Sequence, residues 1–320
     1  MDLSIIIVNW NSKNYLRKCI DSILTTTREI QLEIVIIDNA SFDGCDEMLR
    51  PYYPQVRFIQ GHQNLGFAKA NNTAFQKSRG RNLLFLNPDT EVKNSSIETL
   101  YHQLIKLPDA GIVGATLLNS DGSVQTSCIQ SFPTILNQLF DSNALRNQFP
   151  KASLWGMRPL FTGDPRPTKV DAVSGACLMI KRSVFENVGM FNTEYFMYSE
   201  DIDLCFRVQE AFLNTYYVPT AVFIHHGGGS SYKSGVNAFS SVMMLESRWR
   251  FFRKTRGTWY ARTYRTGMFF ISSIRILLLL LVIWPALRIS CRACSIKSSI
   301  EKWRARLRWT LFLEKWVKNY

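Results

Sequence analysis

Apolar runs of four to six residues alternate with helical patterns over the first 120 positions of the chain. The run at residues 3–8 precedes a segment from Tyr15 to Leu24 in which apolar residues recur at helical spacing, behind Ser12 as a candidate helix cap. Strands are expected at residues 33–38, 56–60 and 82–87, and helices near 45–49, 67–78 and 97–105. This alternation predicts an α/β fold with a mostly parallel central sheet covered by helices on both sides.

The pattern weakens between about residues 120 and 170, where five prolines interrupt it, as in a long excursion over the sheet. Regular patterns resume with an apolar run at 172–180, a helix at 183–188, a helix beginning near Glu200 and a strand at 220–226. After Ser247 the composition becomes abruptly basic and aromatic. We therefore predict a main domain over residues 1–247 and a separate C-terminal region over residues 248–320.

The basic excess of the chain belongs to the C-terminal region. Residues 1–245 carry 21 Lys and Arg against 22 Asp and Glu, whereas residues 246–320 carry 17 against 3. Six tryptophans and the apolar run at 276–287 accompany these charges. Basic residues, tryptophans and an apolar block together indicate a membrane surface, and not nucleic acid, as the partner of this region.

The segment from Gly267 to Leu287 is long enough, at about 1.5 Å per residue, to cross a hydrocarbon layer of about 30 Å. Arg275 interrupts it, and both flanks are strongly basic, which disfavours a single crossing. We therefore expect a helical tail that lies in or dips into the membrane surface, with a single span as the alternative. The N-terminus lacks a basic region or cleavage site and the seven cysteines are scattered, so we expect the cytoplasmic side.

Polar residues follow three of the predicted strands: Asn9 after the first, Asp38 and Asn39 after the second, and Asn87, Pro88 and Asp89 after the strand at 82–87. A single aspartate after a strand is often only a turn former or a helix cap. The carboxyl ends of parallel strands, however, meet at one edge of a sheet, where ligands bind. Three such endings therefore predict one shared site.

The residue types at this edge suggest the ligand. Asp38 could accept a hydrogen bond from the imide nitrogen of a uracil or thymine base. Asp89 offers the hard oxygen ligands that hold Mg²⁺ or Mn²⁺ against a diphosphate. In residues 64–72, Gly66 at a helix start could cradle the diphosphate, or could simply make an ordinary strand-to-helix turn.

Two further segments carry candidate site residues. Glu200 and Asp201 stand in the first turn of a predicted helix, where the helix dipole alone favours acids. Beside a metal and a diphosphate, one of the two could instead remove a proton from a hydroxyl. His225 and His226 end a strand before a glycine run, and either could complete a metal site or contact phosphate.

Six segments, including "SIIIVNWNS", "IVIIDNAS", "LLFLNPDTEV" and "FMYSEDIDLCFRV", occur in the order typical of a known family. Over about residues 1–245 the chain resembles family 2 glycosyltransferases of the GT-A fold, which have a Rossmann-like sheet. Within them it most resembles the bacterial rhamnosyltransferase-like branch that builds cell-surface polysaccharides. The resemblance implies an inverting transfer from a nucleotide diphosphate sugar.

The resemblance also implies roles for individual residues. Asp38 would contact the base, Asp89 would hold the metal and Asp201 would be the general base. The family's DxD motif reads Asn-Pro-Asp here, so its first acid is missing and metal binding would depend more on Asp89 and a histidine. The complete set expected to contact the donor is Asn9, Asp38, Asn39, Asn64, Gly66, Phe67, Asn71, Asn87, Gly175 and Ala176, with Asp201 and Glu200 as catalytic candidates and Asp89, His225 and His226 as metal candidates.

The residues and the resemblance together predict transfer of a sugar, with rhamnose from dTDP-rhamnose favoured, from a dTDP- or UDP-sugar to a hydroxyl of a growing cell-surface polysaccharide. The tail predicts an acceptor on a polyprenyl diphosphate, at the cytoplasmic face of the bacterial inner membrane. Alternatives are a UDP-hexose-using transferase of the same family and a membrane-tethered protein that binds nucleotide sugars without turnover. A nucleotidyltransferase or a dinucleotide oxidoreductase fits poorly, because no glycine-rich loop follows the first strand.

Overall fold

The computed structural model describes residues 1–227, 237–283 and 293–319 and divides the chain into two compact units. The N-terminal unit comprises Met1–Phe132, Arg146–Phe196 and Glu200–Ser230, and the C-terminal unit comprises Pro133–Leu145, Met197–Ser199 and Ser231–Tyr320. Residue 247, where the composition changes, lies inside the helix Asn237–Arg256. The domain boundary at this residue remains a prediction.

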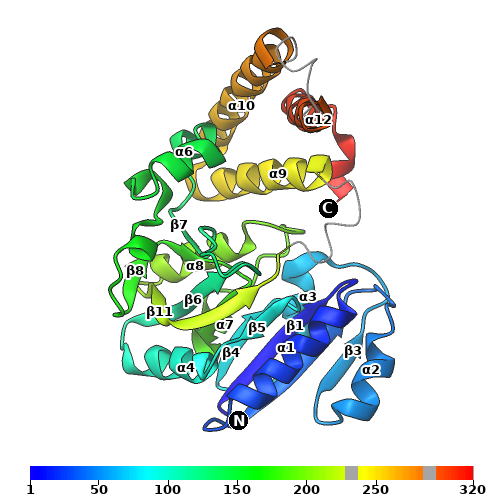
Figure 1. Cartoon of the computed structure of the whole chain (residues 1–320), viewed down its shortest axis with the longest axis vertical. Coiled ribbons are helices and arrows are strands. Elements are labelled where there is room, and N and C mark those ends of the chain that lie inside the picture. The colour runs from blue at the N-terminus through cyan, green and yellow to red at the C-terminus, as the bar shows by residue number, and fades with distance from the viewer. Residues whose placement is uncertain (228–236, 284–292, 320) are drawn as a thin grey trace. The chain divides into compact units, whose positions relative to one another are not determined.

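A nine-stranded sheet forms the centre of the N-terminal unit, with the order β3-β2-β1-β4-β10-β6-β11-β5 and with β8 paired to β11 (Figure 1). Its strands are β1 Leu3–Asn9, β2 Leu32–Asp38, β3 Arg57–Gln60, β4 Asn82–Leu86, β5 Thr90–Val92, β6 Ala110–Leu118, β8 Thr168–Val170, β10 Cys177–Lys181 and β11 Asn214–His225. A separate two-stranded sheet pairs β7 Ile129–Gln130 with β9 Ala172–Val173.

The strands β3, β2, β1 and β4 are parallel to one another, as their apolar runs predicted. Such runs are continuous because a parallel strand is buried on both faces of its sheet. The register aligns Asn9 with Asp38 and Ile7 with Leu86. The polar residues after these strands therefore emerge at the same edge of the sheet, as the sequence predicted.

The other half of the sheet is mixed. Strand β10 runs antiparallel to both β4 and β6, β5 runs antiparallel to β11, and β11 is parallel to β6. The α/β fold thus contains a mixed, mostly parallel sheet. An apolar run such as residues 177–180 predicts a buried strand but carries no information about its direction. The direction depends on the connection, and the chain reaches β10 through the long excursion after β6.

Helices pack on this sheet (Figure 1). They are α1 Lys13–Thr26, α2 Cys45–Tyr52, α3 Gly66–Phe75, α4 Ser96–Lys106, α7 Arg182–Asn187 and α8 Glu200–Glu210. Helix α1 buries Leu16, Cys19, Ile20 and Ile23 of the stripe that its sequence predicted, whereas Leu24 is exposed. The excursion from β6 to β10 contains only short elements, which are β7, α5 Ile135–Leu139, α6 Asn143–Gln148, the 3₁₀ turns η1 Ser153–Trp155 and η2 Arg158–Phe161, and the strands β8 and β9.

Among its described residues, the C-terminal unit has three long helices with an aromatic core. Its elements are α5, α9 Asn237–Arg256, α10 Thr258–Leu278, the π-helical turn η3 Leu279–Ile283, α12 Ala293–Thr310 and the 3₁₀ turn η4 Lys315–Asn319. Tyr264 and Trp309 are buried, and the indole N–H of Trp309 donates to Oε2 of Glu246 (2.9 Å). The guanidinium of Arg265 lies over the rings of Trp309 and Phe312. Some of the basic and aromatic side chains of this region therefore make contacts within the unit itself.

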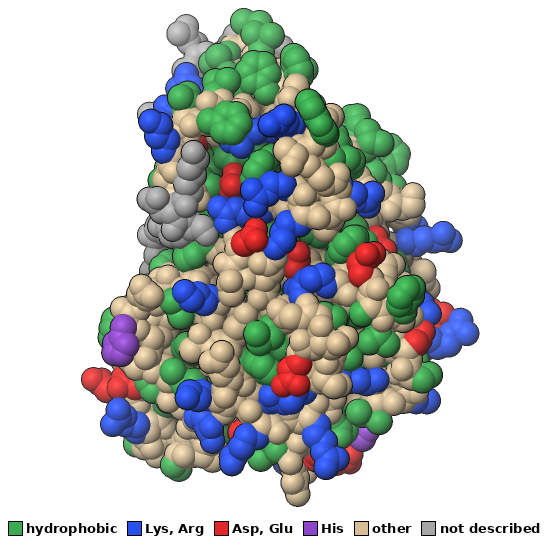
Figure 2. Space-filling model, turned by 180° about the vertical axis from the view of Figure 1, so that it is seen from behind, with side chains coloured by type: hydrophobic (Ala, Val, Ile, Leu, Met, Phe, Trp, Pro, Cys, Tyr) green, Lys and Arg blue, Asp and Glu red, His purple; other side chains and the backbone are tan. Residues whose placement is uncertain are grey.

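One described stretch, Thr258–Leu281, is long and apolar enough to cross a membrane by length and composition alone, and 17% of its most apolar window is buried. Exposed Phe270, Ile274, Leu277 and Leu281 recur along it at helical spacing. Figure 2 shows hydrophobic side chains beside Lys and Arg over these C-terminal helices. Residues 284–287 of the segment predicted from the sequence lie outside the described residues, and membrane association remains a prediction.

Candidate active site

Asp38 ends β2 and is fully buried, and both of its carboxylate oxygens accept hydrogen bonds. Oδ2 accepts from the N–H groups of Ser41 (3.1 Å) and Phe42 (3.0 Å) and from Nε2 of Gln60 (2.8 Å). Oδ1 accepts from Nδ2 of Asn9 (2.9 Å) and from the hydroxyl of Ser41. Burial would raise the pKa of Asp38, but these hydrogen bonds outweigh it and hold the pKa below its usual value. Asp38 therefore organises the loop after β2.

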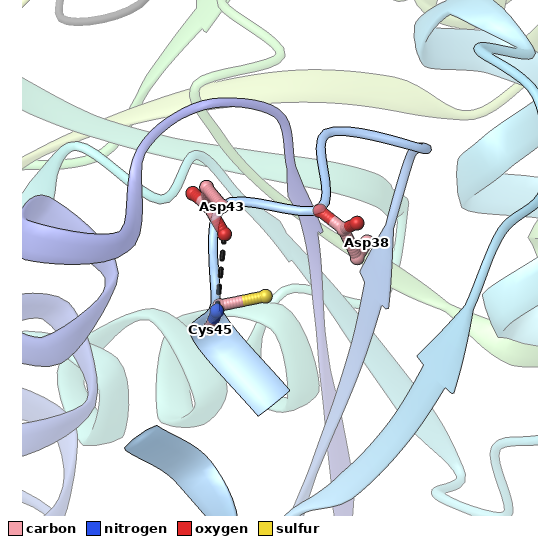
Figure 3. A group of neighbouring side chains, drawn as sticks. All are labelled: Asp38, Asp43 and Cys45. Carbon is pink, nitrogen blue, oxygen red and sulfur yellow. Dashed lines mark hydrogen bonds between the residues drawn. The ribbon is translucent and has the colours of Figure 1, made fainter. Parts of the chain in front are cut away.

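Asp43 and Cys45 lie beside Asp38, and one ligand atom of each residue falls within 4.8 Å of the others (Figure 3). Asp43 already accepts hydrogen bonds from the N–H groups of Lys13 (2.9 Å) and Cys45 (3.1 Å). Burial and the neighbouring carboxylate of Asp43 raise the pKa of the Cys45 thiol, which opposes the thiolate form that binds metals. Because protein donors already occupy these oxygens, the cluster fits a braced loop better than a metal site.

Asn39 joins the end of β2 to the start of α3. Its Nδ2 donates to Oδ1 of Asn64 (2.9 Å), and its Oδ1 accepts from the N–H of Leu65 (2.8 Å). Gly66 has a φ of 74°, and a Cβ at this position would lie 2.2 Å from the carbonyl oxygen of Phe196. The left-handed conformation and this close backbone approach both require glycine.

The first amide groups of α3 contact protein acceptors. The N–H of Gly66 donates to Oδ1 of Asn64 (2.9 Å), and the N–H of Phe67 donates to the carbonyl oxygen of Phe196 (2.7 Å). Asn71 is buried and donates to the carbonyl oxygen of Phe67 (2.9 Å). These protein contacts are sufficient to explain why glycine stands at position 66, with no need for a ligand. The diphosphate cradle expected here remains a prediction.

The three acids in the first turn of α8 have different surroundings. Asp203 is buried, pairs with Arg207 (2.8 Å) and accepts a hydrogen bond from the hydroxyl of Tyr195 (3.2 Å). Glu200 is only 6% exposed, whereas Asp201 is half-buried. Asp201 is therefore the acid of this group best placed to meet a ligand from solvent.

The loop between β9 and β10 connects Asp201 to the end of β4. The N–H of Gly175 donates to Oδ2 of Asp201 (2.9 Å), and the N–H of Asn87 donates to the carbonyl oxygen of Ala176 (3.0 Å). A Cβ at Gly175 would lie 3.3 Å from Cβ of Asp201 and 3.6 Å from the ring of Phe67. A continuous path of contacts therefore leads from Asp201 through Gly175 and Ala176 to Asn87.

Asp89, Asn87 and His225 meet where β5 pairs with β11. The register aligns Thr90 with His225, so the turn before β5 faces the end of β11. Nε2 of His225 is 3.3 Å from Oδ1 of Asp89 and 3.3 Å from Nδ2 of Asn87. A carboxylate oxygen beside an imidazole nitrogen is a donor set that suits a divalent ion such as Mn²⁺. These residues therefore fit the predicted metal site.

His226 contacts different partners. Its Nε2 lies 2.8 Å from Oε1 of Glu91, and its Nδ1 lies 2.8 Å from Oγ of Ser120. Its ring also packs against Tyr15, with 5.3 Å between the ring centroids. Both ring nitrogens are therefore used within the protein. The sequence did not separate the two histidines, and the geometry favours His225 as the metal ligand.

Gln125 contacts a candidate site residue, His225, and the sequence analysis missed it. It lies in the excursion after β6, in a segment without apolar periodicity. Its Nε2 donates to the carbonyl oxygen of His225 (2.6 Å), and its Oε1 lies 2.9 Å from Nδ1 of the same histidine. A glutamine in an irregular segment gives no local signal, so only its contact with a histidine 100 positions later reveals it.

The mixed, mostly parallel sheet with acids beyond its strand ends is an architecture of the GT-A type, as the motifs predicted. A family model described as glycosyl transferase family 2 matches residues 4–189, and the chain belongs to this family. Over 246 residues it is 30% identical to the N-acetylglucosaminyl-diphospho-decaprenol L-rhamnosyltransferase of Mycobacterium tuberculosis, with 72% of this chain and 77% of that protein covered. It is 26% identical over 232 residues to the rhamnosyltransferase WbbL of Escherichia coli, with 69% and 82% covered.

A solved structure with a similar fold is the mannosyltransferase PcManGT of Pyrobaculum calidifontis in complex with GDP-Man and Mn²⁺. The two chains superpose with a TM-score of 0.56 at 14% identity, with 97% of this chain and 86% of that chain covered. An identity this low supports the fold alone. Together, these comparisons confirm the predicted family and its likeness to bacterial rhamnosyltransferases.

Proposed function

We propose that this chain is an inverting, metal-dependent transferase that moves a sugar from a nucleotide diphosphate sugar to a hydroxyl of a lipid-linked cell-surface polysaccharide. Rhamnose from dTDP-rhamnose is the favoured donor, because two relatives are rhamnosyltransferases. The observation that carries the proposal is a path of contacts from a candidate base to a candidate metal site. It runs from Asp201 to Gly175, from Ala176 to Asn87, and from Asn87 to His225 and Asp89.

Asp89 and His225 would hold the divalent ion. Their Oδ1 and Nε2 atoms are 3.3 Å apart. Two donor atoms this close could both reach one divalent ion. His225 would thereby compensate for the acid missing at Asn87. When bound, Mg²⁺ or Mn²⁺ neutralises the charge that develops on the departing diphosphate.

Asp201 would act as the general base. Each of its oxygens accepts one backbone hydrogen bond, from Gly175 (2.9 Å) and Ile202 (2.8 Å), so a lone pair remains on each oxygen. Asp201 takes the proton of the acceptor hydroxyl while that oxygen bonds to the anomeric carbon. The bond from this carbon to the diphosphate breaks on the opposite face, and the configuration is inverted.

Asp38 is the proposed contact of the nucleobase of the donor. This contact favours dTDP or UDP over GDP. Uracil and thymine carry an imide N–H that a carboxylate oxygen can accept. Of the five donors that Asp38 now accepts, the half-exposed side chain of Gln60 is the one that a base could replace without unfolding the loop after β2. The other donors belong to buried Asn9 and to the loop itself.

We further propose that the C-terminal unit binds the cytoplasmic face of the bacterial inner membrane, where an acceptor on a polyprenyl diphosphate would lie. The stripe of Phe270, Ile274, Leu277 and Leu281 is 52–65% exposed. The same unit carries exposed basic side chains that would complement anionic lipid; they are Arg253, Lys254, Arg256 and Arg262. The name of the mycobacterial relative supports this class of acceptor. A single span remains the alternative.

A donor panel tests the function on the full-length protein. The protein is incubated with dTDP-rhamnose, UDP-glucose or GDP-mannose and with Mg²⁺, Mn²⁺ or EDTA, and thermal unfolding and release of nucleoside diphosphate are measured. We expect stabilisation by dTDP- or UDP-sugars only with a metal, and turnover once a polyprenyl-diphosphate-linked saccharide is added.

The other outcomes separate the rival functions. Stabilisation without turnover on any acceptor would favour a nucleotide-sugar-binding protein. Turnover of UDP-glucose in place of dTDP-rhamnose would favour a UDP-hexose-using transferase. A preference for GDP-mannose would contradict the base contact of Asp38, and turnover in EDTA would contradict the metal dependence.

A further inference from the structure

We propose that Gln125 is a positioning residue that places the ring proton of His225 on Nδ1, so that Nε2 is the atom presented to the divalent ion. The inference rests on the proposed metal-dependent function. Its primary observable, the nitrogen that carries the proton, can nevertheless be measured without any sugar transfer.

Two contacts determine the orientation of the Gln125 amide. One end of the amide lies 2.6 Å from the carbonyl oxygen of His225, and this end must be the NH₂ group, because two oxygen acceptors would repel at that distance. The other end is then the acceptor Oε1, which lies 2.9 Å from Nδ1 of His225. Nδ1 must therefore carry a proton.

The backbone of Gln125 keeps the amide in this place. Its N–H donates to the carbonyl oxygen of Leu117 in β6 (2.8 Å), and its carbonyl oxygen accepts from the N–H of Cys128 (3.2 Å). The side chain is also half-buried. The backbone of Gln125 is therefore hydrogen-bonded to the central sheet, which fixes the position of its amide beside His225, although Gln125 itself lies in an irregular segment.

A proton on Nδ1 leaves Nε2 as an acceptor in the neutral ring. Nε2 lies 3.3 Å from Oδ1 of Asp89. Nδ2 of Asn87, also 3.3 Å away, can donate to Nε2, and a divalent ion beside Oδ1 of Asp89 would take the place of that donor. Without Gln125 the ring proton could occupy Nε2 and be donated to Asp89, and the ligand atom would then be lost.

His226 provides an internal comparison. Its Nε2 faces Oε1 of Glu91 (2.8 Å), and an ionised carboxylate can only accept a hydrogen bond. Its Nδ1 faces the hydroxyl of Ser120 (2.8 Å), which can donate. The ring of His226 therefore carries its proton on Nε2. Two consecutive histidines are thus expected to adopt opposite tautomers because their partners differ.

Nitrogen NMR on full-length protein labelled with ¹⁵N-histidine shows which ring nitrogen carries the proton. The chain has four histidines, so few signals need to be assigned. At a pH where the rings are neutral we expect Nδ1–H on His225 and Nε2–H on His226, assigned with His225→Gln and His226→Gln. Gln125→Met, which keeps the length but removes the amide, should abolish the Nδ1–H preference of His225 alone. With dTDP present it should weaken Mn²⁺ binding, measured by calorimetry, by about 10- to 100-fold.

Two further variants separate positioning from a general loss of structure. Gln125→Glu keeps an acceptor for Nδ1–H and should restore the tautomer, but it sets a second oxygen against the carbonyl oxygen of His225, so the Mn²⁺ affinity should recover only in part. Ser120→Ala removes the matched partner of His226 and should leave Mn²⁺ binding unchanged.

Three results would overturn the proposal: Nε2–H on His225 in the unmodified protein, no Mn²⁺ binding by that protein, or equal Mn²⁺ affinity in Gln125→Met. If no sugar is transferred while His225 and Mn²⁺ respond to Gln125 as expected, the proposed function fails and the positioning role stands.

Discussion

The backbone N–H of Gly175 donates a hydrogen bond to Oδ2 of Asp201 at 2.9 Å. A residue in the loop between β9 and β10 thereby orients an acid in the first turn of α8, 26 positions later. Of the neighbouring acids, Glu200 is buried and Asp203 is paired with Arg207. This contact therefore distinguishes Asp201 from two residues of the same chemical type.

Asp201→Asn should lower the rate of sugar transfer by about 10²- to 10⁴-fold, because the variant lacks the group that accepts the proton. Binding of the sugar donor should persist, since the proposed contact of Asp38 with the nucleobase and the proposed metal ligands remain. Calorimetry with dTDP and Mn²⁺, together with the transfer rate, checks both statements. Asp203→Asn is the matched control, and it should lose stability because it leaves Arg207 without its buried partner. Unchanged transfer by Asp201→Asn would remove Asp201 from the role of base.

Gly66→Ala and Gly175→Ala should differ in kind. At Gly66 the φ of 74° and a Cβ contact of 2.2 Å with the backbone of Phe196 would destabilise the fold by about 2–4 kcal/mol. At Gly175 the nearest atom to an added Cβ is Cβ of Asp201, at 3.3 Å, so the loss should stay below about 1 kcal/mol while the transfer rate falls. Urea unfolding and transfer assays on both variants separate the effects. Equal losses of stability would contradict this difference.

Asp38→Asn should destabilise the protein and should make its free energy of unfolding depend less on pH in the acid range. A carboxyl with a lowered pKa stabilises the fold above its unfolded-state pKa of about 3.9, and this contribution is lost as the pH falls through that value toward the folded-state pKa. The amide would also set an NH₂ group against the donors of Ser41, Phe42 or Gln60. At pH 7 we expect the free energy of unfolding of the variant to be about 2–3 kcal/mol lower than that of the unmodified protein. Between pH 5 and pH 2 the variant should lose less additional stability than the unmodified protein does.

Urea unfolding at several pH values measures this response. Asp121→Asn is a suitable control, because Asp121 also accepts hydrogen bonds, from Ser123, but is exposed to solvent. Its stability should stay close to that of the unmodified protein at each pH. An Asp38→Asn variant with the pH profile of the unmodified protein would show that Asp38 does not contribute as described.

The double variant Phe270→Ser/Leu277→Ser should bind anionic vesicles more weakly. Each side chain is more than half exposed, and inserting one into lipid contributes about 1.5–3 kcal/mol, so the double change should cost at least about 100-fold in partitioning. Co-sedimentation with vesicles containing phosphatidylglycerol measures the effect. Phe212→Ser, at a 93% exposed phenylalanine of the N-terminal unit, should leave binding unchanged. Equal partitioning of the double variant and the unmodified protein would contradict a membrane contact through this stripe.

Local patterns in the sequence predicted much of the N-terminal unit. The parallel strands β1, β2 and β4 were recognisable because strands buried on both faces are uniformly apolar. The strand-end positions of Asn9, Asp38 and Asn87 followed from the same runs, since parallel strands end at a common edge. The antiparallel direction of β10 did not follow, because an apolar run reads the same in both directions.

The candidate site was only partly predictable. Asp89 and Asp201 stand in motifs that the sequence shows directly, and both belong to the connected set of site residues. Gln125 could not be found this way, because its role depends on a residue 100 positions away. The difference between His225 and His226 likewise depends on partners from other segments, Asp89 and Glu91.

By itself the sequence determined the family, the strands of the parallel half and the acids at their ends, because hydrophobic periodicity and motif order are local properties of a chain. Only the tertiary structure decided which acid is accessible, which histidine faces Asp89 and which glutamine orients that histidine. The physical reason is that hydrogen-bond geometry and burial arise between distant segments once they pack, and no local pattern encodes those distances.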